Sequence, residues 1–283
     1  MRRRWPARRR AASVRCACWW RSSRPGSREA RTDPEDLQAT ARIALACLDL
    51  TSLNDSETPA EIERLCERAT GRFGAAAAVC VWPRRAALAR SLLPRQVAVA
   101  AVANFPDGGS AIERALRDTG EIVDAGAQEV DLVLPYRDLA AAPALLAAVR
   151  RACAGLTLKV ILETGELKDE AAIRRACRLA LDAGADFLKT STGKTPVSAT
   201  PAAARWLLQA IAADPQARER VGFKPAGGIR TVADAARYIA LVGDILGPGA
   251  VRPGRFRIGA SALLDDIEAV LAGHPGAAPA AGY

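Results

Sequence analysis

From about residue 34 onward, short apolar runs alternate with helical patterns along the chain. The runs are rich in Val, Ile, Leu and Ala, which is typical of parallel strands that are covered on both faces. Their lengths, four to seven residues, also suit strands better than helices. The eight predicted strands are Ala44–Leu50, Ala77–Trp82, Val97–Ala103, Glu129–Leu134, Leu158–Leu162, Asp186–Thr190, Val221–Lys224 and Arg257–Ala260.

Helix start signals lie between these runs. Thr58-Pro59-Ala60-Glu61 predicts a capping box with proline at the first helical position, and Ser110-Ala111-Ile112-Glu113 predicts a second box. Further helices are expected to begin at Thr200-Pro201 and at Thr231-Val232-Ala233-Asp234. In the helix after the fifth strand, apolar residues recur at i, i+3, i+4 and i+7 and predict one buried face: Ile173, Ala176, Cys177 and Ala180.

Eight strand–helix units predict an α/β fold, a single-domain (β/α)8 or TIM barrel. An extra N-terminal helix at Pro34–Ala44 precedes the first strand, and the last helix spans Ala262–Ala272. A doubly wound open sheet is the alternative, although no GxGxxG follows the first strand. We expect a disordered Arg-rich leader at 1–33, the barrel at 34–272 and a flexible C-terminal tail at 273–283.

The positive charge of the chain is concentrated at its beginning. The formal net charge is +9, but residues 1–28 hold ten arginines and no acid, whereas the remainder carries 30 basic and 31 acidic groups. This leader has the composition of a transit peptide, and a disordered tail or a reading frame begun too early is the favoured interpretation. A nucleic-acid-binding protein that acts through the leader is a more distant alternative.

Several classes of protein are disfavoured. No run approaches the 18 or so apolar residues of a membrane span, so no membrane partner is expected. The seven cysteines show no metal-site spacing beyond Cys16-Ala-Cys18 and predict reduced thiols in the cytoplasm. With a single histidine, His274, the chain predicts neither a metal site nor a cofactor.

Lysine is rare in this chain and is placed at strand ends. Of 40 basic residues only five are lysines, and Lys189 and Lys224 lie at the C-terminal ends of the sixth and seventh predicted strands. Lysine can lose its proton and form an imine, whereas arginine can do neither. Two lysines that face each other from neighbouring strands should lower each other's pKa. A deprotonated amine attacks carbonyl carbons, so the pattern predicts Schiff-base chemistry.

Strand alternation predicts that two further charged residues, Asp131 and Lys159, share the barrel interior with Lys189 and Lys224. A purely structural ion-pair network is a strong alternative for Asp131 and Lys159. It is a weak one for Lys189 and Lys224, because like charges do not stabilise each other. Glycines after the seventh and eighth strands, at Gly227-Gly228 and Gly259-Ala260-Ser261, predict a phosphate site.

Several longer motifs resemble one enzyme family. From about residue 46 to its end the chain is similar to the deoxyribose-phosphate aldolases, class I lyases of TIM-barrel fold (EC 4.1.2.4). The motifs that carry the resemblance are Leu48-Asp49-Leu50-Thr51, Val79-Cys80-Val81-Trp82-Pro83, Asn104-Phe105-Pro106, Glu129-Val130-Asp131, Leu158 to Gly165, Phe187 to Lys194, and Gly222 to Arg230.

The resemblance implies a role for each matching residue. Lys189 is expected to form the imine, Lys224 to lower the pKa of Lys189 and transfer protons, and Asp131 to shuttle protons with water. Tyr283 matches a C-terminal tyrosine that reaches the site in some members. The residues expected around the substrate and its phosphate are Asp49, Thr51, Thr192, Gly193, Lys194, Gly227, Gly228, Gly259 and Ser261. Ala262 replaces a second serine that some relatives have.

The reaction implied is the reversible cleavage of 2-deoxy-D-ribose 5-phosphate to D-glyceraldehyde 3-phosphate and acetaldehyde, in deoxyribonucleotide catabolism and carbohydrate degradation. The expected partners are therefore a small phosphorylated sugar and acetaldehyde, with neither nucleic acid nor membrane, and a homodimer is one expected assembly. Another Schiff-base phosphosugar aldolase or a transaldolase is the alternative, and a panel of aldehyde substrates would separate them.

Overall fold

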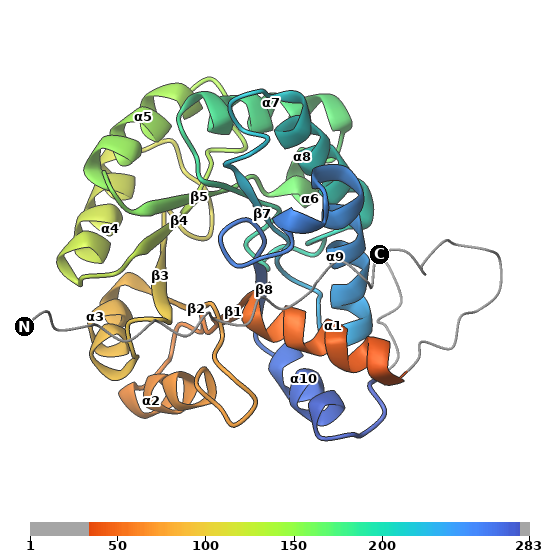
Figure 1. Cartoon of the computed structure of the whole chain (residues 1–283). Helices are drawn as coiled ribbons and strands as arrows, with labels where there is room; N and C mark the ends of the chain where they lie inside the picture. Colours follow the sequence, from red (N-terminus) through yellow and green to blue (C-terminus); the bar gives the residue numbers. More distant parts are fainter. Residues whose placement is uncertain (1–33, 278–283) are drawn as a thin grey trace, which may run out of the picture. The chain divides into compact units, whose positions relative to one another are not determined.

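The computed structural model describes residues 34–277, and in this part of the chain eight parallel strands form a barrel with helices around it (Figure 1). The strands are β1 Leu48–Thr51, β2 Ala78–Val81, β3 Ala98–Ala103, β4 Glu129–Val133, β5 Thr157–Ile161, β6 Phe187–Lys189, β7 Gly222–Lys224 and β8 Ile258–Ala260. Each lies within one residue of its predicted place except for β1. The predicted (β/α)8 barrel is confirmed.

A helix follows every strand, and one more helix precedes the first. The helices are α1 Pro34–Ala46, α2 Pro59–Arg68, α3 Pro83–Leu92, α4 Ile112–Asp124, α5 Ala142–Ala152, α6 Thr164–Leu167, α7 Glu170–Asp182, α8 Pro201–Ala213, α9 Val232–Leu246 and α10 Leu263–Leu271, with a 3₁₀ turn η2 at Pro248–Ala250. In α7 the four apolar residues predicted as one face are all buried.

The boundary between α1 and β1 differs from the prediction. The strand was expected from Ala44, but helical hydrogen bonding continues to Cys47, whose N–H donates to the carbonyl of Ile43. A short apolar run is compatible with a buried helix as well as with a strand. Here the packing of α1 on α9 and α10 decides, because it buries Ala44 and Leu45 as helical residues (Figure 1).

Three of the four predicted helix starts are confirmed. Thr58 and Thr231 each form a capping box with the residue three positions later, and the Thr200 hydroxyl accepts from the N–H of Ala203. Such a side-chain cap is worth about 1 kcal/mol.

The predicted box at Ser110 is wrong. Helix α4 begins at Ile112, so Ala111 is its N-cap, and no side chain caps it. Ser110 lies one residue too early and instead contacts Asp138, with 3.5 Å between Oγ and Oδ2. The start of the helix is held by Arg114, which pairs with Asp107 and donates to the carbonyl of Phe105.

The barrel closes between β7 and β8 without a regular ladder. The strand order is β7-β6-β5-β4-β3-β2-β1-β8, and two isolated parallel bridges, Phe223 with Phe256 and Ala226 with Gly259, join its two ends. Backbone N–H groups also cross this seam, from Arg257 to the carbonyl of Phe223 at 3.1 Å. Consequently the loops that follow β7 and β8 lie side by side at the same end of the barrel.

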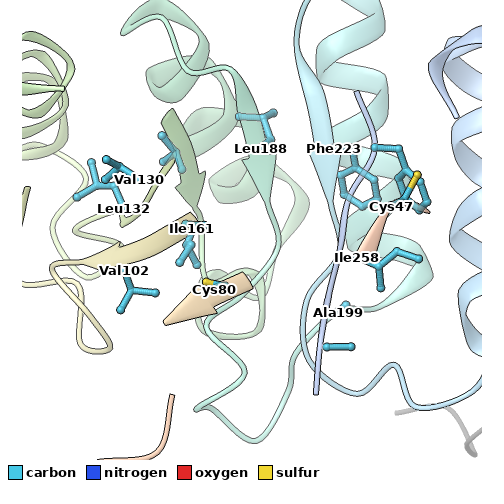
Figure 2. Close-up of a cluster of buried hydrophobic side chains, with 14 of the residues drawn as sticks. Cys47, Cys80, Val102, Val130, Leu132, Ile161, Leu188, Ala199, Phe223 and Ile258 are labelled. Atoms are coloured by element: carbon cyan, nitrogen blue, oxygen red, sulfur yellow. The ribbon is translucent and has the colours of Figure 1, made fainter. Parts of the chain in front are cut away.

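The apolar core lies mainly between the strands and the surrounding helices. Alternate strand residues supply it, and Figure 2 shows part of it, with Val102, Val130, Leu132 and Leu188. All four are at most 1% exposed. Each such side chain contributes about 1.5–3 kcal/mol by its burial.

Inside the barrel, Gly222 makes room for an aromatic ring. A Cβ at Gly222 would lie 2.3 Å from Cε1 of Phe187, so only glycine lets this ring fill the interior of the barrel. Along each strand the outward-facing apolar residues alternate with residues that point into the barrel. Asp131, between Val130 and Leu132, is one of these inward residues, and several of them are charged.

Three sequence-based predictions lie wholly or partly outside the described residues: the leader at 1–33, Tyr283, and most of the tail at 273–283. No helix within 34–277 has both the length and the apolar character needed to cross a membrane.

Candidate active site

The structure brings the four predicted interior residues together. Lys189 and Lys224, the last residues of β6 and β7, are register partners, and so are Asp131 of β4 and Lys159 of β5. Lys189 is 3% exposed and the other three are fully buried. The alternation of side chains along each strand therefore placed them correctly.

A carboxylate lies between the two lysines. The Nζ atoms of Lys189 and Lys224 each lie 2.7 Å from the same oxygen, Oδ2 of Asp131. The other oxygen, Oδ1, is 2.7 Å from Nζ of Lys159. Lys189 and Lys224 thus face each other as predicted, and Asp131, which was predicted to share the interior with them, is shared between their ammonium groups.

Asp131 belongs to a closed circuit of alternating charges that we call the ionic ring. Lys159 Nζ lies 2.6 Å from Glu129 Oε2, and Glu129 Oε1 lies 2.7 Å from Arg257 Nη2. Arg257 Nη1 lies 2.6 Å from Asp49 Oδ1. Asp49 Oδ2 lies 2.5 Å from Lys224 Nζ, which returns to Asp131. In order, the members are Asp131, Lys159, Glu129, Arg257, Asp49 and Lys224.

The ring is electrically balanced, and Lys189 is one cation in excess of it. Among the described residues, three carboxylates and three cations form the ring, and Lys189 is attached only through the oxygen of Asp131 that it shares with Lys224. Burial of an uncompensated charge is costly. Lys189 is therefore the member of this cluster that loses its proton most readily.

The pKa shifts follow the same division. Burial lowers the pKa of Lys189, and the charge of Lys224 adds to this, while Asp131 opposes it. Burial alone would also lower the pKa of Lys224, but Asp131 and Asp49 outweigh it and raise that pKa. In the same way, Asp131, Asp49 and Glu129 hold the pKa of Lys159 well above its usual range. The predicted mutual lowering of the pKa therefore holds for Lys189 and is wrong for Lys224.

A cavity of about 300 Å³ opens at the C-terminal ends of the strands, with Lys189 in its wall. It is formed by the loops that follow β1, β6, β7 and β8. The predicted binding residues that line it are Thr51, Thr192, Gly193, Lys194, Gly227, Gly228, Gly259 and Ser261. Asp49 does not line it. Asp49 is fully buried in the ionic ring, where it contacts Lys224 and Arg257, so any influence of Asp49 on a substrate passes through other residues.

The cavity walls suit an anion. Gly227 and Gly228 have φ angles of +84° and +80°, and a Cβ at Gly227 would lie 2.5 Å from Ser198 Oγ, so the backbone there is bare. Lys194 and Arg230 add positive charge to the lining. Helix α10 also begins beside the cavity, after Ser261 and Ala262, and the N-terminus of a helix favours negative charge.

Glu163, just after β5, fastens the loop that carries Gly193 and Lys194. Its Oε2 accepts hydrogen bonds from the N–H and the hydroxyl of Thr192, and its Oε1 accepts from the Thr195 hydroxyl at 3.1 Å. The side chain is fully buried, and burial raises the pKa of this carboxyl. Glu163 thus fixes one wall of the cavity.

Sequence reasoning missed Glu129, Arg257, Glu163 and Arg230 as parts of the site. The signal for two of them was strand alternation, because Glu129 lies two residues before Asp131 and Arg257 two residues before Gly259. Within residues 34–277 no group of three or more His, Cys, Asp or Glu side chains is placed to hold a metal ion.

Comparison with known proteins shows that the chain is similar to aldolases. Residues 43–268 match the family model of the DeoC/LacD family aldolases. A deoxyribose-phosphate aldolase of Agrobacterium fabrum is 48% identical over 251 residues, which cover 86% of this chain and 96% of that protein.

Solved structures agree. A candidate deoxyribose-phosphate aldolase of Toxoplasma gondii ME49 superimposes with a TM-score of 0.77 at 25% identity, over 86% of this chain and 98% of that one. The tetrameric deoxyribose phosphate aldolase of Aeropyrum pernix gives 0.67 at 25% identity, over 84% and 97%.

Proposed function

The chain belongs to the DeoC/LacD family of aldolases, and from this membership we propose that it is a deoxyribose-phosphate aldolase. It cleaves 2-deoxy-D-ribose 5-phosphate reversibly to D-glyceraldehyde 3-phosphate and acetaldehyde. The observation that supports this most directly is Lys189, a buried amine with a lowered pKa in the wall of a cavity suited to an anion.

The substrate is oriented by its two ends. Its phosphate is received by the loops at Gly227-Gly228 and Gly259–Ser261, with Lys194 and Arg230 nearby. Its aldehyde carbon, C1, then faces Lys189. Because Lys189 lies in the wall of the same cavity, binding of the phosphate also positions the aldehyde for attack.

Lys189 forms the imine. Its neutral Nζ attacks C1 of the open-chain sugar, and the carbinolamine loses water to give an iminium ion. Lys224 and Asp131, which meet at Oδ2 beside Nζ of Lys189, supply and accept the protons for this step. Lys224 keeps its proton available because its pKa is raised.

Cleavage of the C2–C3 bond follows. Asp131, assisted by Lys224 and a water molecule, removes the proton of the C3 hydroxyl, and the bonding electrons move through C2 and C1 to the iminium nitrogen. Glyceraldehyde 3-phosphate leaves, and an enamine remains on Lys189. Protonation of C2 restores the iminium, and addition of water releases acetaldehyde and the free amine. We assign Tyr283 to the protonation of C2.

Two further assignments are part of the proposal. The cytoplasm is the proposed location, because the cysteines indicate a reducing compartment. A homodimer is the proposed assembly, which size-exclusion chromatography with light scattering would test.

Trapping of the imine tests the assignment. Borohydride added together with acetaldehyde should reduce the iminium and leave a two-carbon adduct on the peptide that contains Lys189. Lys189→Arg should remain folded but take up no label, whereas Lys168→Arg, a control at an exposed lysine, should label fully. An adduct on Lys224 or Lys159 would reassign the nucleophile. A panel of phosphosugars then distinguishes this activity from that of a transaldolase or another Schiff-base aldolase.

A further inference from the structure

Arg257 and Glu129 occupy the part of the ionic ring that is remote from Lys189. Neither residue lines the cavity, and Nη1 and Nη2 of Arg257 contact Asp49 and Glu129, respectively. Arg257 Nε donates to the carbonyl of Pro253 at 2.6 Å, and its guanidinium lies 5.7 Å from the centre of the Phe187 ring. The pair therefore reaches the substrate only through other residues.

A buried ion pair such as Arg257 and Glu129 adds little to the stability of a protein by itself. Replacement of buried ion pairs by apolar residues of similar volume is often neutral or stabilising, so the pair needs another reason. Its position suggests one. Arg257 contacts Asp49, which holds Lys224, and Glu129 contacts Lys159, which holds Asp131. Both routes end at the carboxylate that contacts Lys189.

We propose that Arg257 and Glu129 are positioning residues for the aldol reaction, which hold the buried cluster at the charge balance that makes Lys189 the neutral amine. This inference rests on the proposed function in one respect, the assignment of Lys189 as the imine-forming residue. It assigns a task to two side chains that touch neither the substrate nor Lys189.

The charged and titratable groups near Lys189 indicate that Arg257 and Glu129 act on it through the ionic ring. Asp131 of β4 and Lys224 of β7 are ring members, as is Lys159 of β5. Cys80 of β2 lies 3.9 Å from Asp131 Oδ2, and burial raises the pKa of its thiol, which therefore stays neutral. Glu163 also interacts electrostatically with Lys189, but it lies outside the ring and is held by Thr192 and Thr195, which none of the ring contacts involve.

The number of charges in the cluster predicts whether each substitution raises or lowers the pKa of Lys189. Without the charge of Arg257, three carboxylates remain with three lysines, and the cluster is balanced when Lys189 is protonated, so the pKa of Lys189 should rise. Without the charge of Glu129, four cations remain with two carboxylates, so that pKa should fall. Loss of both charges restores the excess of one cation, and the pKa should return close to its original value.

The test measures the protonation of Lys189 without reference to turnover. We would label the folded protein with 2,4-pentanedione, a neutral diketone that condenses with deprotonated amines, and quantify the adduct on the Lys189 peptide as a function of pH. The variants are Arg257→Met, Glu129→Gln, the double variant, and Arg257→Lys, which keeps the charge. Circular dichroism confirms that each is folded.

The expected result is a pair of opposite shifts. The midpoint of labelling should move up by about one unit in Arg257→Met, which is tenfold slower labelling at a pH below the midpoint. It should move down by a similar amount in Glu129→Gln. The double variant and Arg257→Lys should label like the unchanged protein, and the acidic limb of kcat/KM should follow each midpoint.

Shifts in the same direction, or no shift in folded variants, would overturn the inference. If Arg257→Met does not fold, Glu129→Gln still decides, because an unchanged or raised midpoint contradicts the charge count. Failure of the proposed function would look different: Lys189 would show a low midpoint and the predicted shifts, but 2-deoxy-D-ribose 5-phosphate would not be cleaved.

Discussion

Lys189 and Lys159 both place Nζ 2.7 Å from Asp131, yet their charges have different consequences. Lys159 also contacts Glu129 and, at 3.3 Å, Asp49, whereas the described carboxylate contact of Lys189 is the oxygen that it shares with Lys224. Loss of a buried lysine from among three carboxylates leaves buried negative charge without its cation and is strongly destabilising. A buried lysine in excess of the balance destabilises the fold while its reactivity increases.

This difference predicts opposite effects on stability. Lys159→Met should lower the free energy of unfolding by about 3–5 kcal/mol, because buried carboxylates lose their cation. Lys189→Met should abolish turnover but keep or increase stability. Its folded pKa is lowered, so the folded state disfavours the proton, and any gain should be largest below that pKa. Urea unfolding at pH 6 and pH 9 measures both. Equal destabilisation by the two variants would contradict the charge balance.

Lys224 should set the pH at which the enzyme becomes active. In Lys224→Met, three carboxylates and three cations remain, so Lys189 should keep its proton to higher pH. We expect the acidic limb of kcat/KM to rise by at least about one unit, which corresponds to about 1.4 kcal/mol, together with a large loss of rate. An unchanged limb would mean that burial alone lowers the pKa of Lys189.

At the scale of elements, the site depends on how loops are fastened to strand ends. The loop after β6 carries Thr192, Gly193 and Lys194 into the cavity, and Glu163 at the end of β5 holds it by hydrogen bonds to Thr192 and Thr195. Because β5 and β6 are neighbours in the barrel, these hydrogen bonds of Glu163, which we call the Glu163 clamp, join two adjacent strand ends.

Loss of this clamp should weaken substrate binding more than the chemistry. Glu163→Ala removes the acceptor of the Thr192 and Thr195 hydrogen bonds, so the loop should loosen and KM for the phosphorylated sugar should rise about tenfold or more, with a smaller change in kcat. Glu166→Ala, at an exposed carboxylate of the same segment, is the matched control. A fall in kcat at constant KM would instead indicate a direct role of Glu163 in proton transfer.

At the scale of the whole molecule, the ionic ring joins strands from opposite parts of the barrel and makes stability depend on pH. The lysines lower the pKa of Asp131 well below its usual range although burial opposes them. A carboxyl whose folded pKa is depressed stabilises the protein fully above its unfolded pKa of about 3.9, and this contribution is lost as the pH falls through the folded pKa.

Asp131→Asn should therefore lower Tm by a constant amount between about pH 5 and pH 8. The difference in Tm from the unchanged protein should shrink as the pH falls from about 4 toward 2, since the unfolded parent chain then binds a proton at Asp131 that its folded state disfavours. Thermal melts followed by circular dichroism measure this. A difference that is the same at pH 2 and pH 7 would show that Asp131 acts on stability through its shape and not its charge.

The segment before the barrel should be dispensable for both stability and activity. Without residues 1–32 the chain is near neutral, and its predicted elements are complete. A protein that begins at Asp33 should keep the Tm and the turnover of the full chain. A fall of many degrees in Tm would show that the leader packs on the barrel.

Local properties of the chain determined the fold class and the inward residues. Apolar periodicity predicted eight strands and their helices, and alternation along a strand predicted that Asp131, Lys159, Lys189 and Lys224 share one interior. Thr58 and Thr231 were correct as helix caps because a cap is decided within four residues. Such inferences succeed because backbone geometry alone fixes the direction of neighbouring side chains.

The tertiary structure alone decided which charges meet. Arg257 pairs with Asp49 across 208 residues and with Glu129 across 128, and no local pattern encodes these partners. No local pattern encodes the direction of the Lys224 pKa shift, the burial of Asp49 in the ionic ring, or the residue at which α1 ends. The physical reason is that electrostatic free energy depends on the sum of charges gathered in one buried volume, and only closure of the barrel determines which side chains share it.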